Sequence, residues 1–181
     1  MQEESDNHLH DDIDYDVEDV TPGSTITTKS GQRWLSLKAI FRREKKIAII
    51  IDGPNMLRKI GKRQIKVEDF DQIAEKLGSV RTRYILLNQH ASSKLIEAMT
   101  NSGYIPIVEP ADIYVRLYLK ILDSVYRNKA DLVLIGSRDA RIVPLIMKLK
   151  EKGVETAIVG FEPGFSIALK NTADFVFELG N

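Results

Sequence analysis

The stretch "IAIIIDGPNMLRK", residues 47–59, decides the fold and locates the first candidate site. Five apolar residues run without interruption into Asp52, and a Gly-Pro turn and Asn55 follow. A continuous apolar run of this length predicts a strand that is buried on both faces, as in a parallel sheet. This strand ends in a carboxylate and an amide, close in sequence to the basic residues Arg58 and Lys59.

Beyond this stretch, short apolar runs alternate with amphipathic segments. Further strands are expected at 83–88, 104–109, 131–136, 155–160 and 175–179, and helices at 67–80, 92–103, 141–153 and 166–173. Residues 112–127 fit both a strand and a helix, but their length and the need for a crossover between buried strands favour a helix. The alternation predicts an α/β fold, a three-layer α/β/α sandwich around a mostly parallel sheet.

Charge is distributed unevenly along the chain. The first 20 residues carry nine Asp and Glu and no Lys or Arg, which leaves 26 basic and 17 acidic residues elsewhere. We expect residues 1–32 to form a disordered acidic N-terminal tail and polar linker, 33–46 a basic amphipathic helix, and 47–181 the folded domain. A basic body indicates an anionic partner, with nucleic acid the first candidate, while the tail alternatively serves only solubility.

Composition also excludes several classes of protein. The chain has no cysteine, so disulfides and thiolate metal sites are excluded, and we expect a cytoplasmic location. No apolar run approaches the roughly 20 residues that a membrane span needs, and the polar N-terminus is unlike a signal peptide. We therefore expect no membrane partner.

A second carboxylate is expected at the same edge of the sheet as the first. Asp139 follows the strand at 131–136, and the carboxyl ends of parallel strands are where sites form in such sheets. If the two strands are neighbours, Asp52, Asn55 and Asp139 share one crevice, where carboxylates and substrate phosphates could hold Mg²⁺ or Mn²⁺ and activate water. The alternative is structural, because Asp is also common in turns and at helix N-termini.

A resemblance adds to these observations. "IIIDGPNMLRK", then "ADLVLIGSRDARIVPLIMKLKEKGVETAIVG" and the closing "GFEPGFSIALKNTADFVFEL" together resemble the NYN-domain family, a branch of the PIN-like nucleases, and especially its stand-alone prokaryotic and archaeal members. The resemblance implies a PIN-like fold and metal-dependent RNA cleavage by clustered acids. Asp52 and Asn55 match the first motif, and Asp139 matches the first acid of the later one.

The chain departs from that pattern at three positions. Arg141 stands where the later motif normally carries a second acid, and Tyr114 and Lys120 stand where two more acids are expected. Asp112 is the nearest carboxylate that could substitute. The resemblance thus gives Asp52, Asn55, Asp139 and Asp112 as candidate catalytic residues, with Asp52 and Asp139 as candidate metal ligands.

These replacements favour anion binding over metal binding. We expect Asp52 and Asp139 to pair with Lys120 and Arg141, which competes with capture of a cation. Arginine presents a planar fork to phosphate oxygens. The candidate RNA-binding residues are Arg58, Lys59, Lys62, Arg63, Arg116, Lys120, Arg138 and Arg141. Tyr114 and Tyr118 are candidates to stack on a base, with packing in the core as the alternative.

The sequence therefore leads to one principal interpretation and two alternatives. The first is an RNA-associated NYN-domain protein, a pseudo-nuclease that binds RNA or a ribonucleoprotein through a basic crevice. The second is an active endoribonuclease that uses Mg²⁺ or Mn²⁺, and the third is a protein-interaction module. A homodimer, and contact of the acidic tail with its own basic face or with a basic protein, are further expectations.

Overall fold

The computed structural model describes residues 44–57, 59–60, 63–110 and 112–180. The expected acidic tail at 1–32 lies outside these residues. The expected basic helix at 33–46 also lies outside them except for its last three residues, of which Lys46 begins the first strand.

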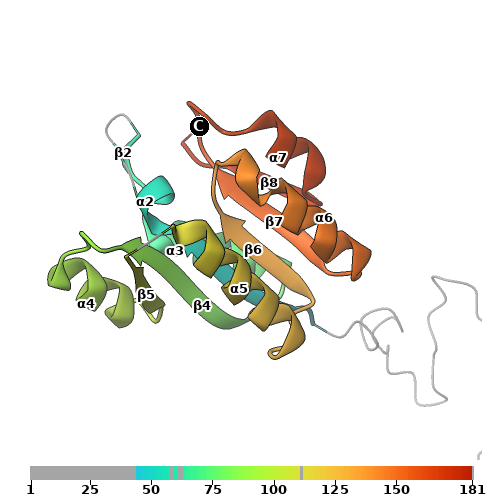
Figure 1. The fold of residues 1–181 in the computed structure, drawn as a ribbon, viewed down its shortest axis with the longest axis horizontal. Helices are drawn as coiled ribbons and strands as arrows, with labels where there is room; N and C mark the ends of the chain where they lie inside the picture. Colours follow the sequence, from blue (N-terminus) through green and yellow to red (C-terminus); the bar gives the residue numbers. More distant parts are fainter. Residues whose placement is uncertain (1–43, 58, 61–62, 111, 181) are drawn as a thin grey trace, which may run out of the picture. The chain divides into compact units, whose positions relative to one another are not determined.

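Six strands form one sheet in which every pairing is parallel, in the order β5-β4-β1-β6-β7-β8 (Figure 1). The strands are β1 (Lys46–Asp52), β4 (Ser79–Asn88), β5 (Ile105–Glu109), β6 (Leu132–Gly136), β7 (Glu155–Gly160) and β8 (Phe175–Glu178). The sequence predicted each of them from its apolar run. β1 lies at the centre of the sheet, between β4 and β6, which is why its side chains are buried on both faces.

Helices cover both faces of the sheet, so the predicted three-layer α/β/α fold is confirmed. The helices are α3 (Val67–Leu77), α4 (Ser93–Asn101), α5 (Ile113–Tyr126), α6 (Val143–Glu151) and α7 (Ile167–Thr172). Alternate residues of β1 enter the two cores: Ile49 packs with α3 and α4, and Ile50 packs with α5, α6 and α7. Residues 112–127 are thus the crossover helix that their length favoured.

Some boundaries differ from the prediction. The expected helix at 67–80 ends at Leu77, because Gly78 terminates it and β4 begins at Ser79. Of the expected helix at 141–153, the first two residues belong to a short 3-10 helix, η1 (Ala140–Ile142), and the α-helix itself covers only Val143–Glu151.

Two small elements after β1 were missed. The Gly-Pro turn opens a one-turn helix, α2 (Gly53–Met56), in which proline occupies a tolerated first-turn position. A two-stranded hairpin follows, β2 (Lys59–Ile60) and β3 (Arg63–Gln64). Elements this short carry too little periodicity to be recognised from sequence. None of the helices in the described part of the chain has the length and apolar character that crossing a bilayer requires.

Candidate functional site

A pocket of about 250 Å³ opens at the carboxyl ends of β1 and β6. The two strands are hydrogen-bonded neighbours, so the residues that follow them meet at one edge of the sheet. We call this the site pocket; it is lined by Asp52, Pro54, Asn55, Ile113, Tyr114, Arg138, Asp139 and Arg141. The structure thus brings Asp52, Asn55, Asp139, Arg138 and Arg141 together, as expected, while their roles stay predictions.

Asp52 is a buried carboxylate held by two donors. Its side chain is only 2% exposed. Oδ1 accepts a hydrogen bond from the backbone N–H of Asn55 at 3.2 Å, which caps α2, and Oδ2 accepts one from the Tyr114 hydroxyl at 3.0 Å. Burial raises the pKa of Asp52 above its ordinary value, although the hydrogen bonds from Tyr114 and Asn55 oppose this shift.

Asp139 is held by Arg141. Its Oδ2 accepts hydrogen bonds from Nη2 and Nε of Arg141 at 2.8 and 3.1 Å, and its Oδ1 accepts one from the Arg141 backbone N–H at 2.9 Å. The Arg141 hydrogen bonds lower the pKa of Asp139 to about 2. The guanidinium of Arg141 also lies 3.7 Å from the centroid of the Tyr114 ring. The predicted pairing of Asp139 with Arg141 is therefore present.

Arg138 also lines the site pocket and hydrogen-bonds to Asn55. Its Nε donates to Oδ1 of Asn55 at 2.9 Å, and its Nη1 donates to the carbonyl of Pro163. Its guanidinium lies 4.1 Å from the centroid of the Phe161 ring. Both arginines of the pocket thus contact an aromatic ring and a polar partner.

Lys120 does not join the site pocket, so the predicted pairing of Lys120 with Asp52 or Asp139 is wrong. Its Nζ lies 3.9 Å from Oδ2 of Asp123 and 4.5 Å from the centroid of the Tyr84 ring. Helix geometry explains the error: position 120 lies six residues, or about 9 Å of helix rise, beyond the pocket residue Tyr114.

Two other candidates on this side also lie outside the lining of the pocket. Asp112 caps α5, because its Oδ1 accepts a hydrogen bond from the Tyr114 backbone N–H at 2.9 Å. Arg116 pairs through Nε with Glu109 at 2.8 Å. Asp112 therefore has the structural role that Asp commonly takes at a helix N-terminus.

Two of the tyrosines of α5, Tyr114 and Tyr118, pack against the core and also donate hydrogen bonds at the site. Tyr114 reaches Asp52, and the Tyr118 hydroxyl donates to the backbone carbonyl of Arg141, which holds the segment that carries this arginine. The sequence did not predict either bond. The only signal was that Tyr114 stands where the resemblance leads one to expect an acid.

The basic run at 58–63 is described in part. Arg58 and Lys62 lie outside the described residues, and the backbones of Lys59 and Arg63 form the β2–β3 hairpin. Binding of RNA by these four residues stays a prediction.

The donor set of the site pocket does not fit a resident divalent cation. Within the described ranges, no cluster of three or more His, Cys, Asp or Glu is placed to hold a metal ion. Both carboxylates already accept hydrogen bonds from protein donors, and a cation at Asp139 would have to displace the guanidinium of Arg141. Mg²⁺ is usually bound through one or two carboxylates, but here both carboxylates are already engaged and two guanidinium groups line the same pocket.

Comparison with known proteins gives the family and the fold. The NYN domain matches residues 46–179. An uncharacterised protein of the archaeon Methanocaldococcus jannaschii is 39% identical over 137 residues, which cover 76% of this chain and 56% of that protein. The chain therefore spans about half the length of this relative. A crystal structure of a Vibrio parahaemolyticus protein of unknown function has the same fold, with a TM-score of 0.69 and 16% identity over 77% of this chain and 96% of that chain.

Proposed function

The chain belongs to the NYN-domain family, whose fold is nuclease-like and RNA-related. From this premise we propose that the chain binds RNA or a ribonucleoprotein at the site pocket and that its nuclease activity is weakened or lost. The proposal concerns this domain, since the chain spans 56% of its archaeal relative.

One observation carries the proposal: Arg141, which replaces an expected acid, neutralises Asp139 inside the site pocket. With both carboxylates ionised, the two guanidinium groups of Arg138 and Arg141 balance their charge. A pocket whose two carboxylates are offset by two guanidinium groups has no excess negative charge to attract a divalent cation, whereas its guanidinium groups suit a phosphate group.

Arginine geometry supports the choice of phosphate. A guanidinium carries five N–H donors, and in Arg141 two of its nitrogens donate to Asp139 while 59% of the side chain is exposed. Charge-assisted hydrogen bonds from such a group to phosphate oxygens are among the strong ones. Contacts of this kind supply affinity without reading sequence, so we expect binding of RNA of many sequences.

The experiment is fluorescence anisotropy with a labelled single-stranded RNA at several salt concentrations. We expect binding that weakens with salt, and a slope of log Kobs against log salt that Arg141→Ala reduces by about 0.7, the value for one lost contact to a single strand. Arg127→Ala is the matched control, because Arg127 also pairs with an aspartate but lies at the far end of α5. It should leave the slope unchanged.

Two results would overturn the proposal. RNA cleavage by the wild type with Mg²⁺ or Mn²⁺, lost in both Asp52→Asn and Asp139→Asn, would instead establish an active endoribonuclease. Absence of any RNA binding at low salt would leave the protein-interaction module as the function.

A further inference from the structure

A second hollow adjoins the site pocket across Pro54. It has a volume of about 280 Å³ and lies between α2, the end of β4 and the start of α4. Its lining consists of Gly53, Pro54, Leu57, Leu87, Asn88, His90, Ala91, Ser92 and Leu95. Because Pro54 lines both hollows, the second hollow lies next to the site pocket.

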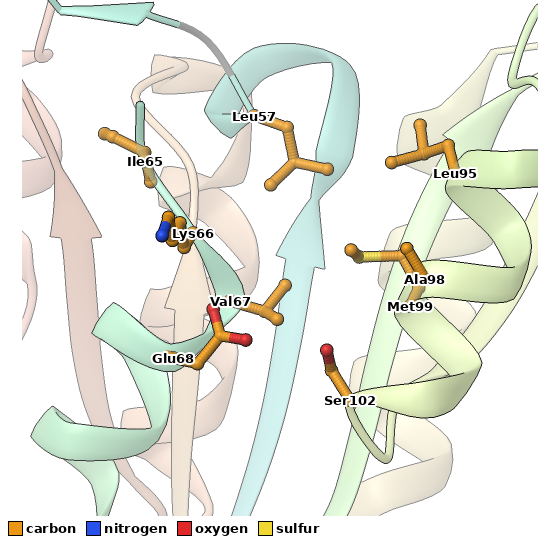
Figure 2. A pocket seen from close by; sticks show the side chains of 9 residues that line it. All are labelled: Leu57, Ile65, Lys66, Val67, Glu68, Leu95, Ala98, Met99 and Ser102. Atoms are coloured by element: carbon orange, nitrogen blue, oxygen red, sulfur yellow. The ribbon is translucent and has the colours of Figure 1, made fainter. Parts of the chain in front are cut away.

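A third hollow lies next to the second. It has a volume of about 400 Å³ and shares Leu57 and Leu95 with its neighbour. Figure 2 shows Leu57 above the opening, with Leu95 and Met99 of α4 pointing toward it from one side and Val67 at the start of α3 from the other. We call the second and third hollows together the apolar groove.

The chemistry of the apolar groove suits a flat apolar group with a polar edge. Pro54, Leu57 and Leu95 supply apolar contact area. Polar side chains border it at the end near the site pocket, where His90 is exposed and the Asn88 Oδ1 accepts from the His90 backbone N–H at 3.1 Å. A nucleobase has this combination of apolar faces and a hydrogen-bonding edge.

The chain around the groove favours a polyanion over an apolar peptide. Leu57 and Ile65, which both line it, lie directly before and after the segment "RKIGKRQ", residues 58–64. Four of these seven residues are Lys or Arg. The groove thus borders a pocket with two arginines, and two of its lining residues flank a basic stretch of the sequence. Proteins that bind single strands combine basic groups for the backbone with separate surfaces for the bases.

We propose that the apolar groove binds nucleobases of a single-stranded RNA whose phosphate occupies the site pocket. This proposal rests on the proposed function. It narrows the class of RNA that is bound to strands with unpaired bases, because paired bases cannot enter the groove. The nucleotide next to the bound phosphate places its base beside Pro54 and Leu57, and the following base lies between Leu95 and Val67.

The test compares two single-stranded oligonucleotides of about ten residues, a length within the site sizes of single-strand binders. One is RNA with a 2-aminopurine base, and the other is the same backbone with abasic positions. We expect the wild type to bind the first at least about tenfold more tightly, because only this strand offers bases that can occupy the groove. A matching RNA duplex should bind no better than the abasic strand.

Paired variants on α4 locate the effect. Leu95→Ala removes a groove residue, whereas Ile96→Ala removes a side chain of equal size that packs on the same core without lining the groove. Ala98→Leu fills the groove, and Thr100→Leu adds bulk at an exposed position of the same helix outside it. Leu95→Ala and Ala98→Leu should reduce the tenfold preference to about twofold, while both controls keep it.

The failures of the two proposals are distinguishable. Equal affinity for the base-containing and abasic strands, with the dependence on Arg141 intact, overturns the nucleobase groove and leaves the proposed function standing. Groove variants that bind RNA like the wild type also overturn it and assign the groove to a protein partner. Absence of binding to either strand overturns both proposals.

Discussion

Replacing Tyr114 by phenylalanine removes one hydroxyl and leaves its ring beneath Arg141. That hydroxyl donates to Asp52 at 3.0 Å, and Asp52 is 2% exposed, so water cannot readily replace the lost donor. A hydrogen bond to an ionised group contributes about 1.5–3 kcal/mol, and one between neutral groups about 0.5–1.5 kcal/mol. We therefore expect Tyr114→Phe to cost more unfolding free energy where Asp52 is ionised than where it is protonated.

The sign of the pH dependence follows from the pKa of Asp52. This pKa lies above 3.8 in the folded protein, so the folded state binds the proton more tightly, and the unfolding free energy falls as pH rises through the window between the two values. Phenylalanine removes a donor that favours the ionised form, which raises the pKa further and extends the fall to higher pH. The difference between wild type and variant should thus grow by about 1 kcal/mol from acid to neutral pH.

Urea denaturation at about pH 3.5 and about pH 7.5 measures this difference for each variant. Tyr118→Phe is the control, because its hydroxyl donates to the backbone carbonyl of Arg141, an acceptor that does not titrate. Tyr118→Phe should lower the unfolding free energy by the same amount at both pH values. A cost of Tyr114→Phe that does not change with pH, or that matches the control throughout, would refute the account of the site pocket given above.

Four further predictions follow from the same geometry. Asp139→Asn should reduce the loss of stability on acidification, measured by thermal unfolding between about pH 4 and 2. The reason is that the pKa of Asp139 is lowered to about 2, so this carboxyl contributes stability that disappears as pH falls through that value. Gly53→Ala should lower the unfolding free energy by about 1–3 kcal/mol, since the added Cβ would lie 2.6 Å from the carbonyl oxygen of Leu86; an unchanged urea midpoint would contradict this. Arg141→Asp should give a melting temperature that rises with added Mn²⁺, unlike the wild type, because it adds a carboxylate and removes the guanidinium from Asp139. Deleting residues 1–20 should tighten RNA binding at low salt, because nine acidic residues that compete for the basic face are removed; unchanged affinity in the anisotropy assay would dispose of that role for the tail.

The sequence predicted those parts of the site that topology alone determines. Asp52 and Asp139 follow buried strands, and the carboxyl ends of neighbouring parallel strands always meet at one edge, so their proximity needed no side-chain detail. Arg141 was also placed correctly, because it lies two residues from Asp139 on the same short segment.

Residues contributed by α5 could not be placed with the same certainty. A helix that crosses the sheet presents only one of its turns to a given strand end, and an apolar stripe does not say which one. The structure shows that this turn holds Tyr114, while Lys120 pairs with Asp123 farther along the helix. The residue types on α5 can be read from the sequence, but their positions along the helix axis relative to the pocket cannot.

The contacts of the site pocket are mutually dependent, and this bears on its function. Arg141 donates to Asp139 and lies on the ring of Tyr114, whose hydroxyl in turn donates to Asp52. If an acid stood at either replaced position, it would add a negative charge beside two carboxylates, and a cation would be needed to offset their repulsion. With tyrosine and arginine there, each carboxylate has a donor from the protein itself, so the folded pocket is electrostatically balanced without a metal. A pocket balanced in this way has no strong electrostatic attraction for a divalent cation, whereas its exposed guanidinium can still bind a phosphate. This difference is the physical reason why we expect RNA binding without metal-dependent cleavage.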